Sequence, residues 1–336
     1  MLVGTRVPPD WLHRPDDLRF LKQIGVDVVD ITMDFIPGFL EAGMRLSREG
    51  LQQAVDAIGE AGLRIERINS LNSQTIDTFL GREGTERELD NVAHNTELIG
   101  EFGLPVLGVQ CFQASQLGHF PGPDYSWVEG RGGYQHLHSD LSDALVDRPA
   151  PEGSPTHDEL WERTIRIFQT VVPIAERFKV RVAMHGNDPP VPKLFGISQI
   201  LYDFDCFDRL FAAVPSDYHG MTFCVGTRYE SGQDVFEGIR RFGEQGKIFH
   251  VHFRNVHGRI PIDGWYEERA PDEGDLSMTQ VAGALQDVGY TAAIDYDHVM
   301  RLVGDEHGKA YIAFCVGHAR GILEGLAAGE TRGEGM

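Results

Sequence analysis

Histidine, cysteine and aspartate side chains that could bind a metal ion follow four consecutive apolar segments in the second half of the chain. Two imidazoles, a thiolate and a carboxylate suit a divalent transition ion such as zinc, iron(II), manganese or cobalt, and do not suit calcium. Taken singly, a cysteine in an apolar strand is often only a small buried side chain, and an aspartate can cap a helix. Their shared position at the ends of apolar segments favours a metal site. The candidates are His185 and Asp188, Cys224, His250 and His252, and Asp295, Asp297 and His298.

The third of these segments, residues 247–257, reads KIFHVHFRNVH. His250, His252 and Arg254 alternate in it with apolar residues, so these three polar side chains share one face of a strand. In a barrel of parallel strands such a face points to the barrel axis, and the carboxyl end of the strand opens onto the active site. The alternative is an edge strand with a solvated face, but solvated faces favour Lys, Glu and Thr.

The elements that would position these residues form one repeating pattern, in which short apolar runs alternate with longer segments of helical periodicity. Glycines that could end helices occur in GEAGLRIERI, GEFGLPVLGV and DVGYTAAIDY. We expect strands at 2–7, 26–32, 64–69, 105–112, 180–185, 220–226, 248–255 and 291–297, and helices at 48–61, 85–102, 157–178, 198–213, 233–243, 278–289 and 309–328. Eight βα units predict an α/β fold, a (β/α)8 TIM barrel. A doubly wound open sheet is the alternative, but it predicts a glycine-rich phosphate loop, and neither GxGxxG nor GxxxxGKS occurs.

Two segments are longer than ordinary loops, at about residues 113–155 and 256–275. Both follow predicted strands, so we expect both on the catalytic face of the barrel, where long connections usually serve as lids or binding loops. Their aromatic residues argue against disordered insertions. We therefore predict a single catalytic domain over residues 1–328 that carries these two insertions, followed by a flexible Gly/Glu-rich tail at 329–336.

The composition is that of an acidic globular protein. The 336 residues include 30 Lys and Arg and 51 Asp and Glu, for a net charge of −21, which argues against nucleic acid or an anionic membrane as a partner. The four cysteines are widely spaced without a CxxC pair, so reduced thiols in the cytoplasm are expected. We expect no signal peptide, no transmembrane helix, a small-molecule substrate and a homo-oligomer.

The chain resembles the D-mannonate dehydratase family through a set of motifs that occur together in the family's order. These motifs are NVAHNTELIGEFGLPVLGVQCF at 91–112, MHGNDPP followed by FGI, FCVGT, HVHFRN, DEGDLSM and IDYDH. The resemblance implies a metal-dependent TIM barrel akin to the xylose-isomerase-like superfamily, and a hydro-lyase of hexuronate catabolism. Family members convert D-mannonate to 2-keto-3-deoxy-D-gluconate and water with Mn²⁺ or Fe²⁺.

Carried over motif by motif, the resemblance implies metal ligands at His185, Cys224, His252 and Asp297. It also implies a catalytic role for His298, which directly follows the last of these ligands. The next region departs from the family, because DEHGKAYIAF replaces a PGY segment whose tyrosine is an acid/base group.

Tyr311 is our candidate for that acid/base role. His318 stands where many relatives have tyrosine, and Val299 and Met300 follow the Asp-His pair where relatives have glycine. These differences indicate a divergent member of the family.

Dehydration of a 2,3-dihydroxy acid removes the proton at C2 and the hydroxyl at C3, so it needs a base, an acid and a Lewis acid. The imidazole of His298, with an unperturbed pKa of about 6.5, suits one of the proton transfers. Arg254 and Arg228 are candidates for substrate binding because guanidinium offers planar paired donors, and a structural ion pair is the alternative for Arg254. His250 and Asn187 are further candidates for contacts with the substrate.

Two other functions are compatible with such a barrel. Sugar isomerases and epimerases of the same superfamily usually assemble two Glu, an Asp and a His around the metal, whereas no Glu ends the fifth, sixth or eighth predicted strand. A non-catalytic carbohydrate-binding protein would have little need for proton-transfer groups beside a metal. A dehydratase is therefore our interpretation, with the isomerase or epimerase as the alternative.

Overall fold

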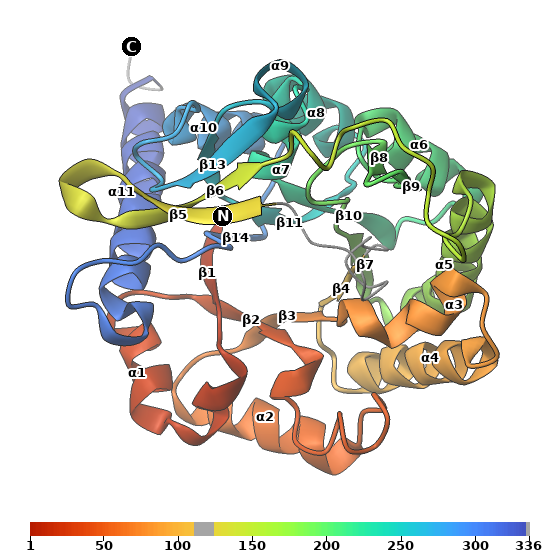
Figure 1. Ribbon diagram of the computed structural model, residues 1–336. Coiled ribbons are helices and arrows are strands. Elements are labelled where there is room, and N and C mark those ends of the chain that lie inside the picture. The colour runs from red at the N-terminus through yellow and green to blue at the C-terminus, as the bar shows by residue number, and fades with distance from the viewer. Residues whose placement is uncertain (111–123, 334–336) are drawn as a thin grey trace.

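The computed structural model describes residues 1–110 and 124–333, and at its centre lies a closed barrel of eight parallel strands surrounded by helices (Figure 1). The predicted TIM barrel is confirmed. It closes where the first strand pairs with the last, with Leu2 opposite Ala293. Around the barrel, the strands are β1 (Leu2–Arg6), β2 (Val28–Thr32), β3 (Ile65–Asn69), β4 (Val106–Val109), β7 (Arg181–Met184), β10 (His219–Cys224), β11 (Ile248–His252) and β14 (Ala293–Asp295).

The helices cover the outside of the barrel because each buries one apolar stripe against the strands. The longer helices are α1 (Pro15–Gln23), α2 (Arg48–Glu60), α4 (Thr85–Glu101), α5 (His157–Phe178), α6 (Phe204–Ala213), α8 (Val235–Gly243), α10 (Met278–Asp287) and α11 (Lys309–Gly333). Shorter α-helices are α3 (Ile76–Leu80), α7 (Val225–Glu230) and α9 (Ile260–Asp263). Single 3-10 turns are η1 (Pro9–His13), η2 (Met33–Phe35), η3 (Asn72–Thr75), η5 (Arg131–Gly133) and η6 (Glu306–Gly308).

Several elements differ from the sequence prediction, most clearly three of the helices. Helix α1 was not predicted. Helix α6 begins at Phe204 and not at residue 198, because Asp203 caps it by accepting a hydrogen bond from the Cys206 N–H at 2.8 Å. The segment before this cap forms a small hairpin, β8 (Lys193–Leu194) and β9 (Ile197–Ser198). Helix α11 continues to Gly333, past residue 328, since the predicted tail contains no proline that would stop it.

The two insertions pair with each other in a four-stranded antiparallel sheet, which we call the cover sheet. It consists of β5 (Asp124–Glu129), β6 (Gln135–Asp140), β13 (Trp265–Arg269) and β12 (Asn255–His257). Strand β13 joins the insertions by pairing with β6, with Tyr266 opposite Ser139. Because β12 begins at Asn255, shortly after β11 ends at His252, the cover sheet is attached at the carboxyl end of the barrel (Figure 1). No helix in the described part of the chain is long and apolar enough to cross a membrane.

Close packing between helices and barrel gives a direct test of the fold. A Cβ atom at Gly238, in α8, would overlap the ring of buried Phe204, so Gly238→Ala should lower the free energy of unfolding by about 1–3 kcal/mol. Gly321, on an exposed face of α11, has no atom near its Cβ position, so Gly321→Ala should raise stability by about 0.5–1 kcal/mol. Denaturant unfolding measures the free energy of unfolding of both variants. Equal changes in the two variants would contradict the packing described.

Candidate metal centre and active site

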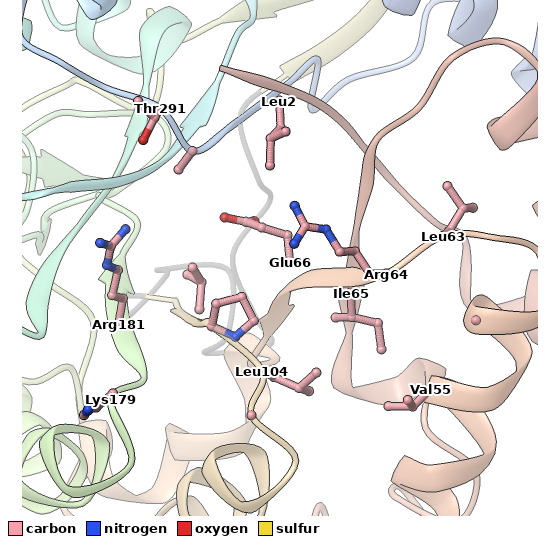
Figure 2. Close-up of a pocket in the computed structure, with 15 residues that line it drawn as sticks. Leu2, Val55, Leu63, Arg64, Ile65, Glu66, Leu104, Lys179, Arg181 and Thr291 are labelled. Atoms are coloured by element: carbon pink, nitrogen blue, oxygen red, sulfur yellow. The ribbon is translucent and has the colours of Figure 1, made fainter.

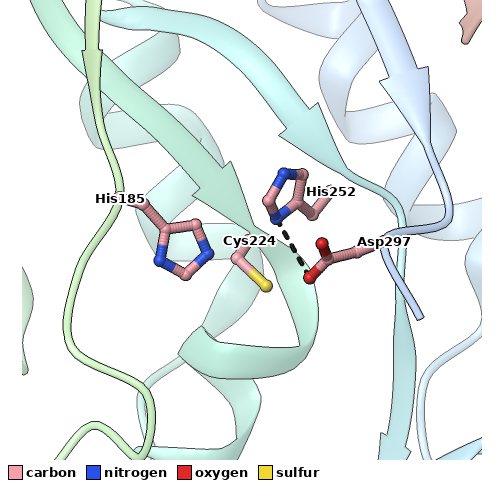
Figure 3. A group of neighbouring side chains, drawn as sticks. All are labelled: His185, Cys224, His252 and Asp297. Atoms are coloured by element: carbon pink, nitrogen blue, oxygen red, sulfur yellow. Dashed lines mark ion pairs between the residues drawn. The ribbon is translucent and has the colours of Figure 1, made fainter. Parts of the chain in front are cut away.

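Four side chains that could bind a metal meet at the carboxyl end of the barrel (Figure 3). The ligand atoms of His185, Cys224, His252 and Asp297 all lie within 4.8 Å of one another. His185 directly follows β7, Cys224 ends β10, His252 ends β11, and Asp297 lies two residues after β14. Neighbouring parallel strands thus bring together the four residues to which the resemblance assigned metal binding.

The chemistry of these donors fits a divalent transition ion. The His185 Nδ1–H donates to the Gly186 carbonyl at 2.8 Å, which leaves the lone pair on Nε2 free. The Nδ1 atom of His252 is buried without a hydrogen-bond partner in the described residues, although it lies 3.2 Å from Oδ2 of Asp297. An orphaned buried nitrogen beside a carboxylate and a thiol is what a metal site requires before its ion is bound.

Burial sets the protonation of these groups. It lowers the pKa of His185 to about 4 and that of His252 well below its usual value, so both rings are neutral near pH 7. Burial acts to raise the pKa of Asp297, but His252 and His298 outweigh it and hold that pKa well below normal. Neutral imidazole and ionised carboxylate are the forms that bind metal. Burial raises the pKa of the Cys224 thiol to about 12, so thiolate formation must accompany metal binding.

His298 lies next to the four ligands, between the barrel and the cover sheet. Its Nδ1 is 2.8 Å from Oε1 of Glu268, and its Nε2 is 3.4 Å from Oδ2 of Asp297. Burial acts to lower the pKa of His298, but Glu268 and Asp297 outweigh it and raise that pKa. The ring faces a cavity of about 320 Å³ lined by Asn72, Tyr125, Leu137, Ser139, Asp188, Tyr266, Glu268 and His298. His298, a candidate proton-transfer group, therefore contacts the candidate metal site on one side and lines a cavity with room for a small molecule on the other.

Arg254 lies in a buried network of carboxylates beside this cavity. Its Nη2 is 2.6 Å from Oε1 of Glu230 and 3.3 Å from Oδ2 of Asp188, and its Nη1 pairs with Glu268. Nη2 also donates to the Thr227 hydroxyl at 2.9 Å. The guanidinium of Arg254 is thus held by ion pairs within the protein. This is the structural ion pair that the sequence offers as the alternative to a contact with the substrate.

Arg228 and Asn187 lie behind the metal site and not on the cavity. Arg228 is buried in α7, donates to the Tyr202 carbonyl at 3.3 Å and stacks on the ring of Phe207. The Asn187 side chain donates to Oε1 of Gln199 at 2.9 Å and so holds the connection that follows β7. Neither residue is among those that line the cavity.

His250 and Tyr311 are also placed away from the cavity. His250 lies one layer deeper in the barrel, with Nδ1 3.1 Å from Glu66 and Nε2 3.1 Å from Asp295. Tyr311 packs in a buried cluster with Tyr134, Ala270, Met300 and Cys315, and burial raises the pKa of its hydroxyl well above normal. The resemblance suggested Tyr311 through a tyrosine near the right place in the sequence, whereas helix α11 turns its ring toward this cluster.

Sequence reasoning missed several residues of the site. Tyr266 and Glu268 alternate in WYEER, a period of two that indicates a strand, but the segment was interpreted as a loop. The charged side chains Arg6, Asp30 and Arg67 on the first three strands were also missed, because residues inside apolar runs were counted only as strand formers. Asp188 was named as a possible metal ligand and instead faces Arg254.

A second, larger cavity lies at the opposite end of the barrel (Figure 2). It measures about 750 Å³ and is lined by the beginnings of strands, with Arg64 and Glu66 on one side and Arg181 on the other. Two groups of described residues could hold a metal ion, the cluster above and a second one of Asp30, His250, His252 and Asp295, and neither lies in the wall of this cavity. We therefore assign the active site by its chemistry, and not by the size of the cavity.

The Cys224 thiolate can be tested as a metal ligand. Cys224→Ser should sharply reduce the metal-to-protein ratio after dialysis, because a hydroxyl is a far weaker ligand than a thiolate for a transition ion. Cys206→Ser is the matched control, since that half-buried thiol lies in α6, outside the cluster. Elemental analysis measures both, and an unchanged metal content in Cys224→Ser would remove this residue from the ligand set.

Comparisons with known proteins identify the family and the fold of this chain. The model of the UxuA family, D-mannonate dehydratase, matches residues 155–330, more than half of the chain. A mannonate dehydratase of Thermotoga neapolitana is 25% identical over 345 residues, covering 90% of this chain and 91% of that protein. The crystal structure of mannonate dehydratase from Streptococcus suis serotype 2 superposes with a TM-score of 0.81 at 23% identity, over 98% of this chain and 95% of that one.

D-psicose 3-epimerase of Clostridium cellulolyticum H10 shares the fold at a TM-score of 0.62 and 12% identity, over 96% of this chain and 99% of that one. The family match spans the four-ligand cluster and every motif except the one at 91–112, and the chain belongs to the D-mannonate dehydratase (UxuA) family.

Proposed function

We propose that this protein is a metal-dependent hydro-lyase that removes water from D-mannonate to give 2-keto-3-deoxy-D-gluconate, a step of hexuronate breakdown in the cytoplasm. The observation that carries the proposal is the position of His298 between the four-ligand cluster and a cavity of about 320 Å³. Membership of the family supports the reaction, and so do the names of the relatives. We propose Mn²⁺ or Fe²⁺ as the ion.

The reaction breaks the C2–H and C3–O bonds, and the hydroxyl leaves as water once it is protonated. A divalent ion held by His185, Cys224, His252 and Asp297 would supply Lewis-acid stabilisation of the negative charge that develops beside the substrate carboxylate. His298 exchanges a proton with the substrate through Nε2, because Glu268 occupies its Nδ1.

The reaction also needs a second proton-transfer group. Tyr266 is our candidate from position, since it lines the cavity with His298 and its hydroxyl lies 3.4 Å from Oδ1 of Asp188. Burial raises its pKa well above normal, so the hydroxyl stays protonated near pH 7 and is a hydrogen-bond donor toward the departing hydroxyl. Tyr311, suggested by the resemblance, is the alternative.

Replacement of His298 tests the proposed mechanism. His298→Asn should reduce turnover of D-mannonate by roughly 10²-fold or more, because proton transfer by a positioned group typically contributes 10²–10⁴ in rate. The measurement is 2-keto-3-deoxy product formed by metal-loaded protein, with metal content as the control. Near wild-type turnover would exclude His298 as a proton-transfer group.

A matched pair of tyrosine variants decides between the two candidates for the second group. Tyr266→Phe should lower kcat by roughly 10²-fold, whereas Tyr311→Phe should change kcat by only a few-fold, because its ring packs in a cluster away from the cavity. Steady-state kinetics with D-mannonate measure both. The reverse result would assign the role to Tyr311.

A panel of substrates separates the dehydratase from an isomerase or epimerase on the same barrel. Metal-loaded protein should form 2-keto-3-deoxy acids from D-mannonate or another aldonic acid and should leave free sugars unchanged. The ligand set of two His, a Cys and an Asp, without Glu, favours this outcome. Isomerised free sugars, with no keto-deoxy product from any aldonic acid, would support the isomerase instead.

A further inference from the structure

We propose that Asp30, Arg6 and Arg67, which we call the Asp30 network, position the metal ligands His252 and Asp297 from the half of the barrel that supplies no ligand. The network residues stand on β1, β2 and β3, whereas the ligands follow β7, β10, β11 and β14. The inference deepens the proposed function and rests on its metal site. It gives the first strands of the barrel a part in the chemistry.

Asp30 is the centre of the network. Its Oδ2 accepts hydrogen bonds from Arg6 Nε at 3.0 Å and from Arg67 Nη1 at 3.1 Å. Asn69 donates to both oxygens of the same carboxylate, at 2.8 and 3.0 Å. The Asp30 side chain is 1% exposed and that of Arg67 is 0% exposed, so water does not compete for these contacts. A buried carboxylate with this many donors has a single orientation.

Each arginine of the network reaches one metal ligand. Arg6 Nη1 lies 3.2 Å from Oδ1 of Asp297, and this leaves Oδ2 of that carboxylate directed at the cluster. Arg67 Nη1 lies 3.1 Å from Nε2 of His252, on the edge of the ring opposite Nδ1, the atom directed at the cluster. The network therefore sets which atom of each ligand faces the metal.

Two features make these ligands dependent on such support. Asp297 has a left-handed backbone, with φ of 52°, so the backbone alone does not favour its position. Metal-binding histidines usually donate their second N–H to an acceptor. At His252 a guanidinium lies 3.1 Å from that nitrogen, and a metal on Nδ1 would leave the proton on Nε2, so Arg67 limits the position of the ring by contact and not by accepting a hydrogen bond from it.

The barrel keeps space for the network. A Cβ atom at Gly108, in β4, would overlap the Asn69 carboxamide and lie 2.7 Å from Nε of Arg67. Arg67 is further held by donating from Nη2 to the Thr222 hydroxyl at 3.1 Å. The network thus fills the barrel interior where β4 has no side chain, and a methyl group at Gly108 should displace it without changing any charge.

The charge of Asp30 gives the network a second effect on the metal. Arg6 and Arg67 are two fixed positive charges within hydrogen-bond distance of two metal ligands. In a buried site they would repel a divalent cation, and the Asp30 carboxylate offsets part of that repulsion. Removal of this carboxylate should weaken metal binding both by releasing the ligands and by leaving the positive charges unbalanced.

The test measures Co²⁺ binding to the chelator-stripped full chain in the absence of substrate. Asp30→Asn should raise the Co²⁺ dissociation constant by roughly 10–100-fold, the usual effect of losing a group that orients a ligand. It should also shift the visible d–d bands, which report ligand geometry, while the thiolate charge-transfer band of Cys224 persists. Gly108→Ala should shift the same bands in a chain of unchanged charge.

Glu88→Gln is the matched control, because Glu88 is a buried carboxylate in α4 that accepts hydrogen bonds from Thr78 far from the site. It should lower stability and leave the Co²⁺ affinity and spectrum unchanged. If Asp30→Asn does not fold, Arg6→Lys replaces it, since Arg6 is 32% exposed and one ammonium cannot bridge Asp30 and Asp297. Wild-type affinity and spectrum in the folded variant would overturn the proposal.

An equal loss of Co²⁺ affinity in Glu88→Gln and Asp30→Asn would also overturn it, by showing a general effect of stability. Failure of the proposed function gives a different result. A wild-type chain that binds Co²⁺ with the expected thiolate band but dehydrates no aldonic acid would refute the dehydratase and leave this inference intact.

Discussion

The active site depends on the buried ion pairs of Arg254. Its guanidinium joins Glu230 on α7, Asp188 after β7 and Glu268 on the cover sheet, so one side chain connects three separate parts of the chain. Burial acts to lower the pKa of Arg254, but the surrounding acidic groups raise it well above normal. A buried ion pair of this kind stabilises the fold little overall. Loss of one partner nevertheless costs about 3–5 kcal/mol, because it leaves the other charges buried without a partner. The position of the cover sheet over the barrel is therefore tied to a charge inside it.

This arrangement also explains how an acidic chain can accept an acidic substrate. With a net charge of −21, the protein as a whole repels anions, and the cavity wall contains the carboxylates of Asp188 and Glu268. Arg254 and His298 pair with these carboxylates, so little negative charge remains free at the wall. The positive charge that attracts a substrate carboxylate then comes from the metal ion, the largest local charge in such a site.

The barrel could be predicted from the sequence because its signals are local, whereas the set of four candidate ligands came from the family resemblance, and the structure brings those four residues together. Strand and helix periods repeat eight times, and each ligand stands at a strand end. The cover sheet could not be predicted in this way, since β6 and β13 are separated by more than a hundred residues and only pairing makes the sheet. Glu268, which orients His298, was missed for the same reason. Tyr311 was suggested by a similar motif, but its role depends on the direction of a side chain, which the spacing of a motif does not determine.

One half of the barrel contains the candidate metal ligands and the other half contains the Asp30 network, and closure of the sheet brings the two halves together. The ligands come from the second half and the Asp30 network from the first, so Arg6 reaches Asp297 only when β1 pairs with β14. A metal that requires both halves binds the closed barrel far better than an open chain, and such binding stabilises the closed form by mass action. Binding of the ion would thus stabilise the pairing of β1 with β14, which closes the barrel, in addition to its part in the reaction. This coupling gives a physical reason for charged residues to occupy the interior of strands that do not line the cavity.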